Sequence, residues 1–243
     1  MTKQLTKKLI LDENLGYILG TVLGDGCICI KNGTISLGVI DKDFALTFKK
    51  TLEEWSGFTT TFSSHVLKDS GKIIWEVILS SVYIIDHLKN YNLNKIKTAS
   101  KKIKKMFLKG MYDSEGSVPK DPKQQDINIS NNNKQLLQFC KDLLSDLGIE
   151  SNSIFICIKK GSVAHFPNNK KSIVKRNIYG FDINKKENLI KFRNLVGFSI
   201  KRKQNKLIDM INSYITKKQR HFINKLIPSK RKNWRKLYNA SYL

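Results

Sequence analysis

The sequence predicts an α/β (α+β) fold made of two pseudo-symmetric α-β-β-α-β-β-α repeats within its 243 residues. The first observation behind this prediction is a segment rich in small residues that ends in an acid and a glycine and occurs twice, about 90 residues apart. The second is the hydrophobic pattern, which is the same after each of these segments. The third is the composition, because 40% hydrophobic residues can form a core, whereas a net charge of +24 indicates a polyanionic partner, first of all a nucleic acid.

Each repeat is expected to begin with a helix that has small residues along one face. The first, at residues 15–26, has glycine at every fourth position and ends in Asp25 before a glycine. The second, at residues 105–116, ends in Glu115 before a glycine. Residues four apart lie on the same face of an α-helix, which has about 3.6 residues per turn. We therefore expect the two small-residue faces to pack together in parallel and to bring the two acids side by side.

Two acids at these positions are electrostatically unfavourable. Each carboxylate faces the negative end of a helix dipole, which costs about 0.3–1 kcal/mol, and each repels the other. A single acid followed by glycine is usually just the end of a helix, but two at matched positions, each followed by the same strand pattern, indicate a functional site. A divalent cation bound between Asp25 and Glu115 would remove the conflict, and hard oxygen ligands suit Mg²⁺.

The next elements follow in the same order in both repeats. Residues 27–39 are expected to form a hairpin around an Asn-Gly turn, and residues 117–130 form its longer counterpart. An amphipathic helix comes next and ends at Gly57 in the first repeat and at Gly148 in the second. Its apolar residues are Phe44, Leu46, Phe48 and Leu52 in the first repeat and Leu136, Leu137, Phe139, Leu143 and Leu144 in the second.

A second hairpin and a short helix close each repeat. The strands of these hairpins are expected at residues 59–65 and 73–79, and at residues 154–160 and 173–183. The short helices are expected at residues 82–88 and 187–195. The two repeats then cover residues 10–100 and 101–213.

A basic C-terminal extension follows at residues 214–243. From residue 200 onward the chain contains 13 Lys and Arg and one acid, which gives 13 − 1 = +12, half of the net charge. Residues 214–227 have helical spacing, and Trp234, Tyr238 and Tyr242 are expected to pack against the second repeat. The lysines around them are expected to bind phosphates without reading sequence.

The sequence also excludes several classes of protein. It has no run of about 18 apolar residues that could span a membrane, and its first residues lack a secretory signal. We therefore expect a soluble intracellular protein, in an organelle (mitochondrion or chloroplast) or in a microbial cytoplasm. The four cysteines and four histidines are scattered, which argues against a zinc finger.

On these residues the chain resembles the LAGLIDADG homing endonucleases in their single-chain, two-motif form. The nine-residue motif lies at residues 18–26 and 108–116; Leu23 stands where the family often has an acid, and Asp113 occupies that place in the second copy. The resemblance implies a pseudo-twofold monomer whose paired motif helices form the interface and whose two antiparallel sheets form a saddle on DNA. It implies a double-strand break in a long DNA target, dependent on Mg²⁺ or another divalent cation, which promotes the mobility of a host intron.

The resemblance also implies roles for individual residues. Asp25 and Glu115 match the metal ligands of the family. The backbone carbonyls of Gly24 and Ser114, freed at the helix ends, could add ligands. The family has a basic residue near the end of each repeat, close to the scissile phosphate. The candidates are Lys97 and Lys201. Lys95 and Lys203 are alternatives, because the alignment of the two repeats in these segments slips by one or two residues. In so basic a chain, however, a single lysine more commonly contacts a phosphate or solvent than takes part in catalysis.

The hairpins are expected to read the DNA sequence. A two-stranded ribbon fits the major groove, and its side chains alternate between the two faces. The candidate DNA-binding residues are Lys31, Ser36, Asn128, Ser130, Lys159, Lys175 and Arg176. The loop at residues 161–171 is longer than its counterpart and is expected to hold the DNA backbone.

Two other functions fit the sequence less well. A non-cleaving intron RNA maturase or DNA-binding regulator could use the same fold, but such proteins often lose a motif carboxylate, and this chain retains both. A protein of the membrane surface would need a basic helix with a strong apolar stripe, which this chain lacks. The expected partner is therefore a double-stranded DNA target, with intron RNA as a further candidate and no membrane, and the chain is expected to be a monomer.

Overall fold

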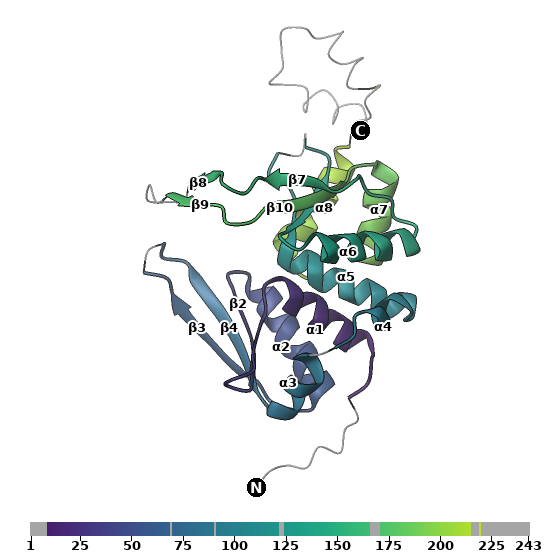
Figure 1. Cartoon of the computed structure of the whole chain (residues 1–243). Helices are drawn as coiled ribbons and strands as arrows, with labels where there is room; N and C mark the ends of the chain where they lie inside the picture. The colour runs from purple at the N-terminus through teal and green to yellow at the C-terminus, as the bar shows by residue number, and fades with distance from the viewer. Residues whose placement is uncertain are drawn as a thin grey trace, which may run out of the picture.

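The fold is described from a computed structural model, which covers residues 9–68, 70–89, 91–121, 124–165, 171–214 and 219. These residues form two α/β repeats that meet along a pair of central helices (Figure 1), so the predicted fold class is confirmed. Apart from Tyr214 and Gln219, the expected C-terminal extension lies outside the described residues. The packing of Trp234, Tyr238 and Tyr242 therefore stays a prediction.

The first repeat runs from α1 to α4. Its elements are α1 (Glu13–Gly24), β1 (Cys27–Cys29), β2 (Thr34–Val39), α2 (Lys42–Ser56), β3 (Thr61–Val66), β4 (Ile73–Ser80), α3 (Val82–Lys89) and α4 (Asn94–Lys97). The strands form an antiparallel sheet in the order β1-β2-β4-β3. The Asp12 side chain accepts a hydrogen bond from the Leu15 amide at the start of α1, and Gly57, with φ of 75°, ends α2.

The second repeat runs from α5 to α8. Its elements are α5 (Lys101–Glu115), β5 (Gly116–Ser117), β6 (Ile127–Asn131), α6 (Lys134–Asp146), β7 (Phe155–Ile158), β8 (Val163–His165), β9 (Lys171–Ile173), β10 (Ile178–Ile183), α7 (Lys186–Leu195) and α8 (Lys201–Asn212). Four of the strands form an antiparallel sheet in the order β5-β6-β10-β7, which repeats the arrangement of the first sheet.

Two details of the repeats differ from the sequence prediction. The strand expected at residues 173–183 is divided, because β9 pairs with β8 in a separate two-stranded sheet and β10 begins at Ile178. Between them Asn177 accepts a hydrogen bond from the Lys160 amide, so a side chain replaces the strand pairing there. In α2, Leu46 is exposed and Ala45 is buried, because the face against the sheet follows Phe44, Ala45 and Phe48.

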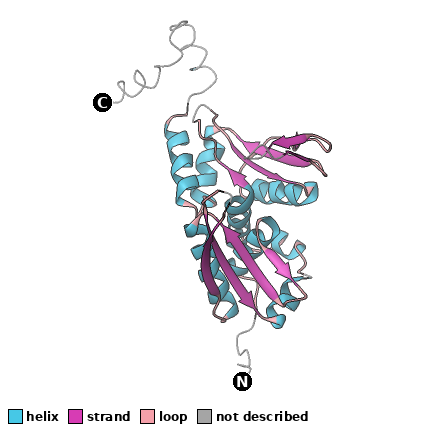
Figure 2. Ribbon diagram, turned by 90° about the vertical axis from the view of Figure 1, so that its left-hand side faces the viewer, coloured by secondary structure: helices cyan, strands magenta, loops and turns pink. Residues whose placement is uncertain are grey.

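The helices and the sheets lie on opposite sides of the molecule. The helices α2 and α6 pack on one face of their respective sheets, where Phe48 and Val77 are buried in the first repeat and Leu144 and Phe181 in the second. In Figure 1, α1 and α5 run side by side from the region of α4 toward the strands. Figure 2 shows the molecule from the side of the strands, with the two sheets around the ends of this helix pair. No helix among the described residues is long and apolar enough to cross a membrane.

Candidate active site

The helices α1 and α5 pack through their small residues, as the sequence predicts. A Cβ added to Gly20 would overlap the carbonyl oxygen of Phe107 on α5, and a Cβ added to Gly110 would overlap the carbonyl oxygen of Tyr17 on α1. The two backbones are thus in direct contact, which is possible because these positions lack side chains. This contact fixes the positions of the two helix ends relative to each other.

The two acids lie together at those ends. Asp25 follows the last residue of α1, and Glu115 is the last residue of α5. A Cβ added to Gly24 would lie 3.2 Å from Cγ of Glu115 and would overlap Ser114, so the helix ends touch here. Glu115 is half-buried and its Oε1 accepts a 2.6 Å hydrogen bond from Nδ2 of Asn131 on β6, whereas Asp25 is more exposed than Glu115 but still partly covered.

Both carboxyl groups resist ionisation. Loss of solvation raises the pKa of Asp25, and the positive charge of Lys203 acts in the opposite direction. The pKa of Glu115 is raised by loss of solvation and then by the charge of Asp25, while the Asn131 hydrogen bond and Lys203 oppose this shift. The mutual repulsion expected from the sequence is therefore present in the folded chain.

This repulsion predicts that Glu115→Gln stabilises the metal-free protein. The raised pKa means that ionised Glu115 weakens the folded state, and glutamine keeps an oxygen for Asn131 without the charge. The gain in stability should be complete at pH values above the raised folded-state pKa. It should shrink as the pH falls through that pKa toward the ordinary carboxyl value of about 4.3, because the wild-type side chain is then neutral as well.

Thermal unfolding in EDTA over this pH range measures the effect. Asp209→Asn, at an exposed acid of α8, is the control and should leave the midpoint almost unchanged. A Glu115→Gln gain of equal size at both ends of the pH range would contradict the electrostatic explanation.

A buried lysine lies at the end of α5, near the two acids. Lys203 of α8 is 8% exposed, and its Nζ donates hydrogen bonds to the carbonyl oxygens of Tyr112 (3.2 Å) and Asp113 (2.6 Å) at the end of α5. Burial lowers the pKa of Lys203, and the charges of Asp113 and Asp25 act in the opposite direction. The lysine thus places a positive charge at the negative end of the α5 dipole. From the sequence, only a metal ion is expected to compensate the negative charge there.

The lysines first expected beside the acids lie elsewhere. The side chain of Lys201 is exposed, and its backbone amide donates a 2.6 Å hydrogen bond to Oδ2 of Asp43. Lys97 is on α4, at the other end of α5, where its Nζ is 3.1 Å from Oδ2 of Asp142. The structure therefore brings neither side chain to Asp25 and Glu115 but brings the alternative, Lys203, to both.

A buried carboxylate connects the start of α8 to both motif helices. Asp113 is 1% exposed and accepts hydrogen bonds from the Ser199 amide (2.8 Å), the Ser199 hydroxyl (2.5 Å) and the Tyr17 hydroxyl (2.9 Å). Burial raises the pKa of Asp113, and these hydrogen bonds oppose that shift. The network fixes the approach of the chain to α8 and hence the position of Lys203.

The open side of Asp25 borders a cavity of about 390 Å³. Arg202 and Lys203 of α8 and Asp41 also line it. The Arg202 guanidinium donates two hydrogen bonds to the Asp41 carboxylate, at 3.0 Å and 2.7 Å, which ties α8 to the first repeat. Asp25 and Lys203 thus share one wall of this cavity.

The candidate DNA-binding residues are divided between strand faces and loops. Ser36 on β2 and Asn128 and Ser130 on β6 are half-buried on the sheet faces that point away from the helices. Nδ2 of Asn128 donates a 2.7 Å hydrogen bond to Oδ1 of Asp182. The cationic candidates are all exposed in loops next to strands, namely Lys31, Lys159, Lys175 and Arg176.

Comparisons with known proteins give relatives of the same fold. Two uncharacterized proteins of Methanocaldococcus jannaschii are similar in sequence. MJ0314 is 33% identical over 164 residues, which are 60% of this chain and 59% of the relative. MJ0398 is 32% identical over 182 residues, which are 73% of this chain and 64% of the relative. The chain thus spans less than two thirds of the length of either relative.

Two solved structures illustrate the shared fold. Full-length DUF199/WhiA from Thermatoga maritima aligns with a TM-score of 0.55 and 13% identity over 91% of this chain and 67% of that chain. The homing endonuclease I-DmoI, in complex with DNA and Ca, aligns with a TM-score of 0.53 and 19% identity over 76% of this chain and 90% of that chain. At these identities the likeness concerns the fold alone.

The fold and the site define a class of proteins in which two α/β repeats are joined by paired helices with an acid at each helix end. The family described as a LAGLIDADG-like domain matches residues 102–197, which form most of the second repeat. Residues 102–197 therefore form a LAGLIDADG-like domain, and the first repeat of the chain has a sheet of the same arrangement.

Proposed function

We propose that the chain is a site-specific homing endonuclease, which makes a double-strand break in a long DNA target and so promotes the mobility of a host intron. The observation that carries this proposal is the pairing of Asp25 and Glu115, two carboxylates that resist ionisation, at the helix ends between the two sheets. Groups with such shifted pKa values, exposed to a cavity, are typical of sites that bind or react.

The DNA duplex would lie across the outward faces of the two sheets. These faces offer polar side chains to the base edges, such as Ser36, Asn128 and Ser130, and the loops around them offer lysines to the phosphates. The central strands β4 and β10 carry Glu76 and Asp182, and carboxylates can accept a hydrogen bond from the amino group of cytosine. The excess of lysine in the chain would supply most of the affinity, with a strong dependence on salt.

The carboxylate and carbonyl oxygens at the helix ends are suitable ligands for a divalent cation. Asp25 and Glu115 would hold it, and the backbone carbonyls of Gly24 and Ser114 lie where the helix ends touch. Among the described residues there is no group of three or more His, Cys, Asp and Glu side chains that could hold a metal ion, so DNA phosphates and water would complete the coordination. A bound divalent cation supplies charge neutralisation and activation of water for phosphodiester hydrolysis.

The residues of the chain would then have distinct roles. Asp25 and Glu115 would each act mainly in the cleavage of one DNA strand. Asn131 orients the carboxylate of Glu115 through its 2.6 Å hydrogen bond. Lys203 would stabilise the negative charge that develops on the scissile phosphate, because its ammonium group is close enough to both acids to shift their pKa values.

The experiment is a cleavage assay with full-length protein. The substrate is duplex DNA that carries the spliced exon junction of the host gene, incubated with Mg²⁺ or with EDTA. Two fragments with Mg²⁺ and intact DNA with EDTA are expected. Binding of this DNA without any cut in Mg²⁺ would contradict the endonuclease and would favour a DNA-binding regulator on the same fold, whereas binding confined to intron RNA would favour a maturase.

The side chains of Lys201 and Lys203 can be distinguished by mutation. Lys203→Met should slow single-turnover cleavage about 10²-fold, because it removes a charge held near the reacting phosphate. It should also move the acidic limb of the pH profile to higher pH, because the charge of Lys203 lowers the pKa of Asp25 and of Glu115. Lys203→Arg should recover part of the rate.

Lys201→Met is the matched variant, since it removes an exposed lysine two residues away on the same helix. It should change DNA affinity slightly and leave both the rate and the pH profile of bound DNA close to wild type. If Lys201→Met moved the pH profile and Lys203→Met did not, the assignment would be reversed.

A further inference from the structure

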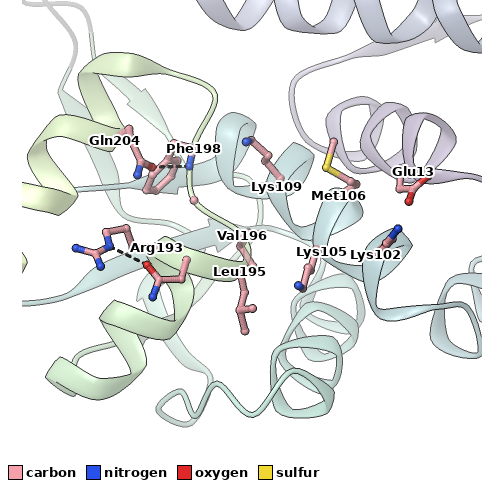
Figure 3. Close-up of a pocket in the computed structure, with 12 residues that line it drawn as sticks. Glu13, Lys102, Lys105, Met106, Lys109, Arg193, Leu195, Val196, Phe198 and Gln204 are labelled. Atoms are coloured by element: carbon pink, nitrogen blue, oxygen red, sulfur yellow. Dashed lines mark hydrogen bonds between the residues drawn. The ribbon is translucent and has the colours of Figure 1, made fainter.

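A second cavity, of about 480 Å³, lies between α5 and the connection from α7 to α8. Figure 3 shows its walls: Lys102, Lys105 and Lys109 come from α5, and Arg193 comes from α7. The three lysines are at positions i, i+3 and i+7, so they line one face of the helix. Four cations thus surround a cavity of a size that is typical of ligand sites.

In the part of the chain that the structure describes, none of these cations forms an ion pair, although the charge of Lys109 acts on buried Asp113. Glu13 is the one acid among the residues that line the cavity, and no ion pair joins it to the four cations. The lysine of α5 that faces α6 is different, because Nζ of Lys104 is 2.6 Å from Oδ2 of Asp146. The chain therefore neutralises one side of α5 and leaves the cavity side positive.

This excess of positive charge is unfavourable for α5 by itself. The first turn of α5 has no acid and begins with lysines, although the positive end of a helix dipole favours acids there. Lysines three and four residues apart on one face also repel each other. An anion in the cavity would reverse both effects, so the arrangement is explained by an anionic ligand rather than by stability.

The cavity is separate from the carboxylates. Lys102 and Glu115 are 13 residues apart on one helix, or about 20 Å at 1.5 Å per residue. The acids lie at the strand side of α5, whereas Lys102 lies in its first turn, near α4. Lys109, at the near end of the cavity, is six residues or about 9 Å from Glu115, so a duplex bound over the acids would leave the Lys102 end of the cavity open.

The walls of the cavity also contain apolar side chains. Met106 lies between the lysines on α5, and Leu195 lies opposite on α7; both are half-buried. A site that combines cations with partly exposed apolar side chains suits a nucleotide whose base is unstacked, because the phosphate meets the cations and the base meets the apolar wall. A base pair inside a duplex cannot make the second contact.

We propose that this cavity, lined by Lys102, Lys105, Lys109 and Arg193, binds a nucleotide of a single-stranded nucleic acid, with its phosphates on the lysines and its base against Met106 and Leu195. This binding does not depend on cleavage and holds whether or not the proposed endonuclease activity is present.

The test compares two doubly substituted full-length proteins that lose the same charge. Lys102→Gln/Lys105→Gln removes two cavity lysines without an acid partner. Lys50→Gln/Lys104→Gln removes two lysines that are paired with Glu54 and Asp146. Fluorescence anisotropy in EDTA measures binding of labelled oligo(U) RNA, oligo(dT) DNA and a duplex of equal length over a range of salt concentrations.

The cavity variant should bind the single strands about tenfold more weakly than the control variant. It should lower the slope of log affinity against log salt by about 1.4, which is 0.7 for each of two phosphates. Its duplex binding should match that of the control. The oligo(U) and oligo(dT) arms show whether the site prefers ribose or deoxyribose.

Two outcomes would overturn the proposal. One is equal binding of single strands by both variants, and the other is a loss that is as large for the duplex as for the single strands, which would be a general effect of charge. Misfolding is measured separately by thermal unfolding. Because the lysines destabilise α5, the cavity variant is expected to unfold at the wild-type temperature or above it.

Discussion

Asp25→Asn and Glu115→Gln are each expected to lower the rate of double-strand cleavage by about 10³-fold, since each removes one of the two charges that would hold the divalent cation. Both substitutions keep the size of the side chain, and Glu115→Gln keeps an oxygen for the 2.6 Å hydrogen bond from Asn131. DNA affinity should stay the same or rise slightly, because a negative charge is removed from the surface that we propose to face the DNA phosphates.

A supercoiled plasmid that carries the target site distinguishes the two strands. If each acid acts mainly on one strand, each single variant should produce some nicked circular plasmid, in which only one strand is cut. The double variant Asp25→Asn/Glu115→Gln should leave the plasmid supercoiled. Asp209→Asn, which changes an exposed acid of α8, should cut as the wild type does. Linear product from the double variant at the wild-type rate would remove both residues from the proposed site.

Gly20→Ala is expected to prevent stable folding or to cost about 3 kcal/mol or more of unfolding free energy, because one methyl group would overlap a backbone carbonyl of the facing helix. A side chain in the way could rotate, but the Phe107 carbonyl belongs to α5 itself, so the two helices would have to move apart. That movement would also separate Asp25 from Glu115.

Denaturant unfolding of Gly20→Ala beside Gly38→Ala measures this cost. Gly38 is the matched control, because an added Cβ would lie 3.7 Å from Cγ2 of Ile74 and no closer to any other atom outside its own neighbours. Gly38→Ala should change the unfolding free energy by less than about 1 kcal/mol. Equal stability of the two variants would mean that α1 and α5 are not in backbone contact.

Much of the fold follows from local patterns in the sequence. Glycine at every fourth position predicts a face for close helix packing, and the Asn-Gly turn and the alternating strands after it predict β1 and β2. The apolar spacing predicts α2 and α6, although Leu46 of α2 is exposed, because the buried face is set by the angle at which α2 meets its sheet. The division of one expected strand into β9 and β10 accompanies a hydrogen bond from the Lys160 amide to the Asn177 side chain, and no local sequence pattern predicts this contact.

The candidate site shows the same division. The two acids could be found because each is tied to a repeated motif. Lys203 could not be separated from Lys201 in the sequence, where the segment could be a turn. In the structure this segment is the helix α8, and side chains two positions apart on a helix point in directions that differ by about 200° around its axis. Lys203 therefore faces the end of α5, while Lys201 faces solvent.

The sequence by itself determined the two repeats, the paired helices and the place of Asp25 and Glu115, because these depend on spacing along the chain and on the absence of side chains at a few glycines. The tertiary structure alone decided what surrounds the acids. Ser199 and Lys203 reach α5 across about 90 residues of sequence, and the cations of the second cavity meet from α5 and α7. Contacts between residues so far apart are set by how the helices pack, and burial and charge, which shift the pKa values of the acids, arise from that packing.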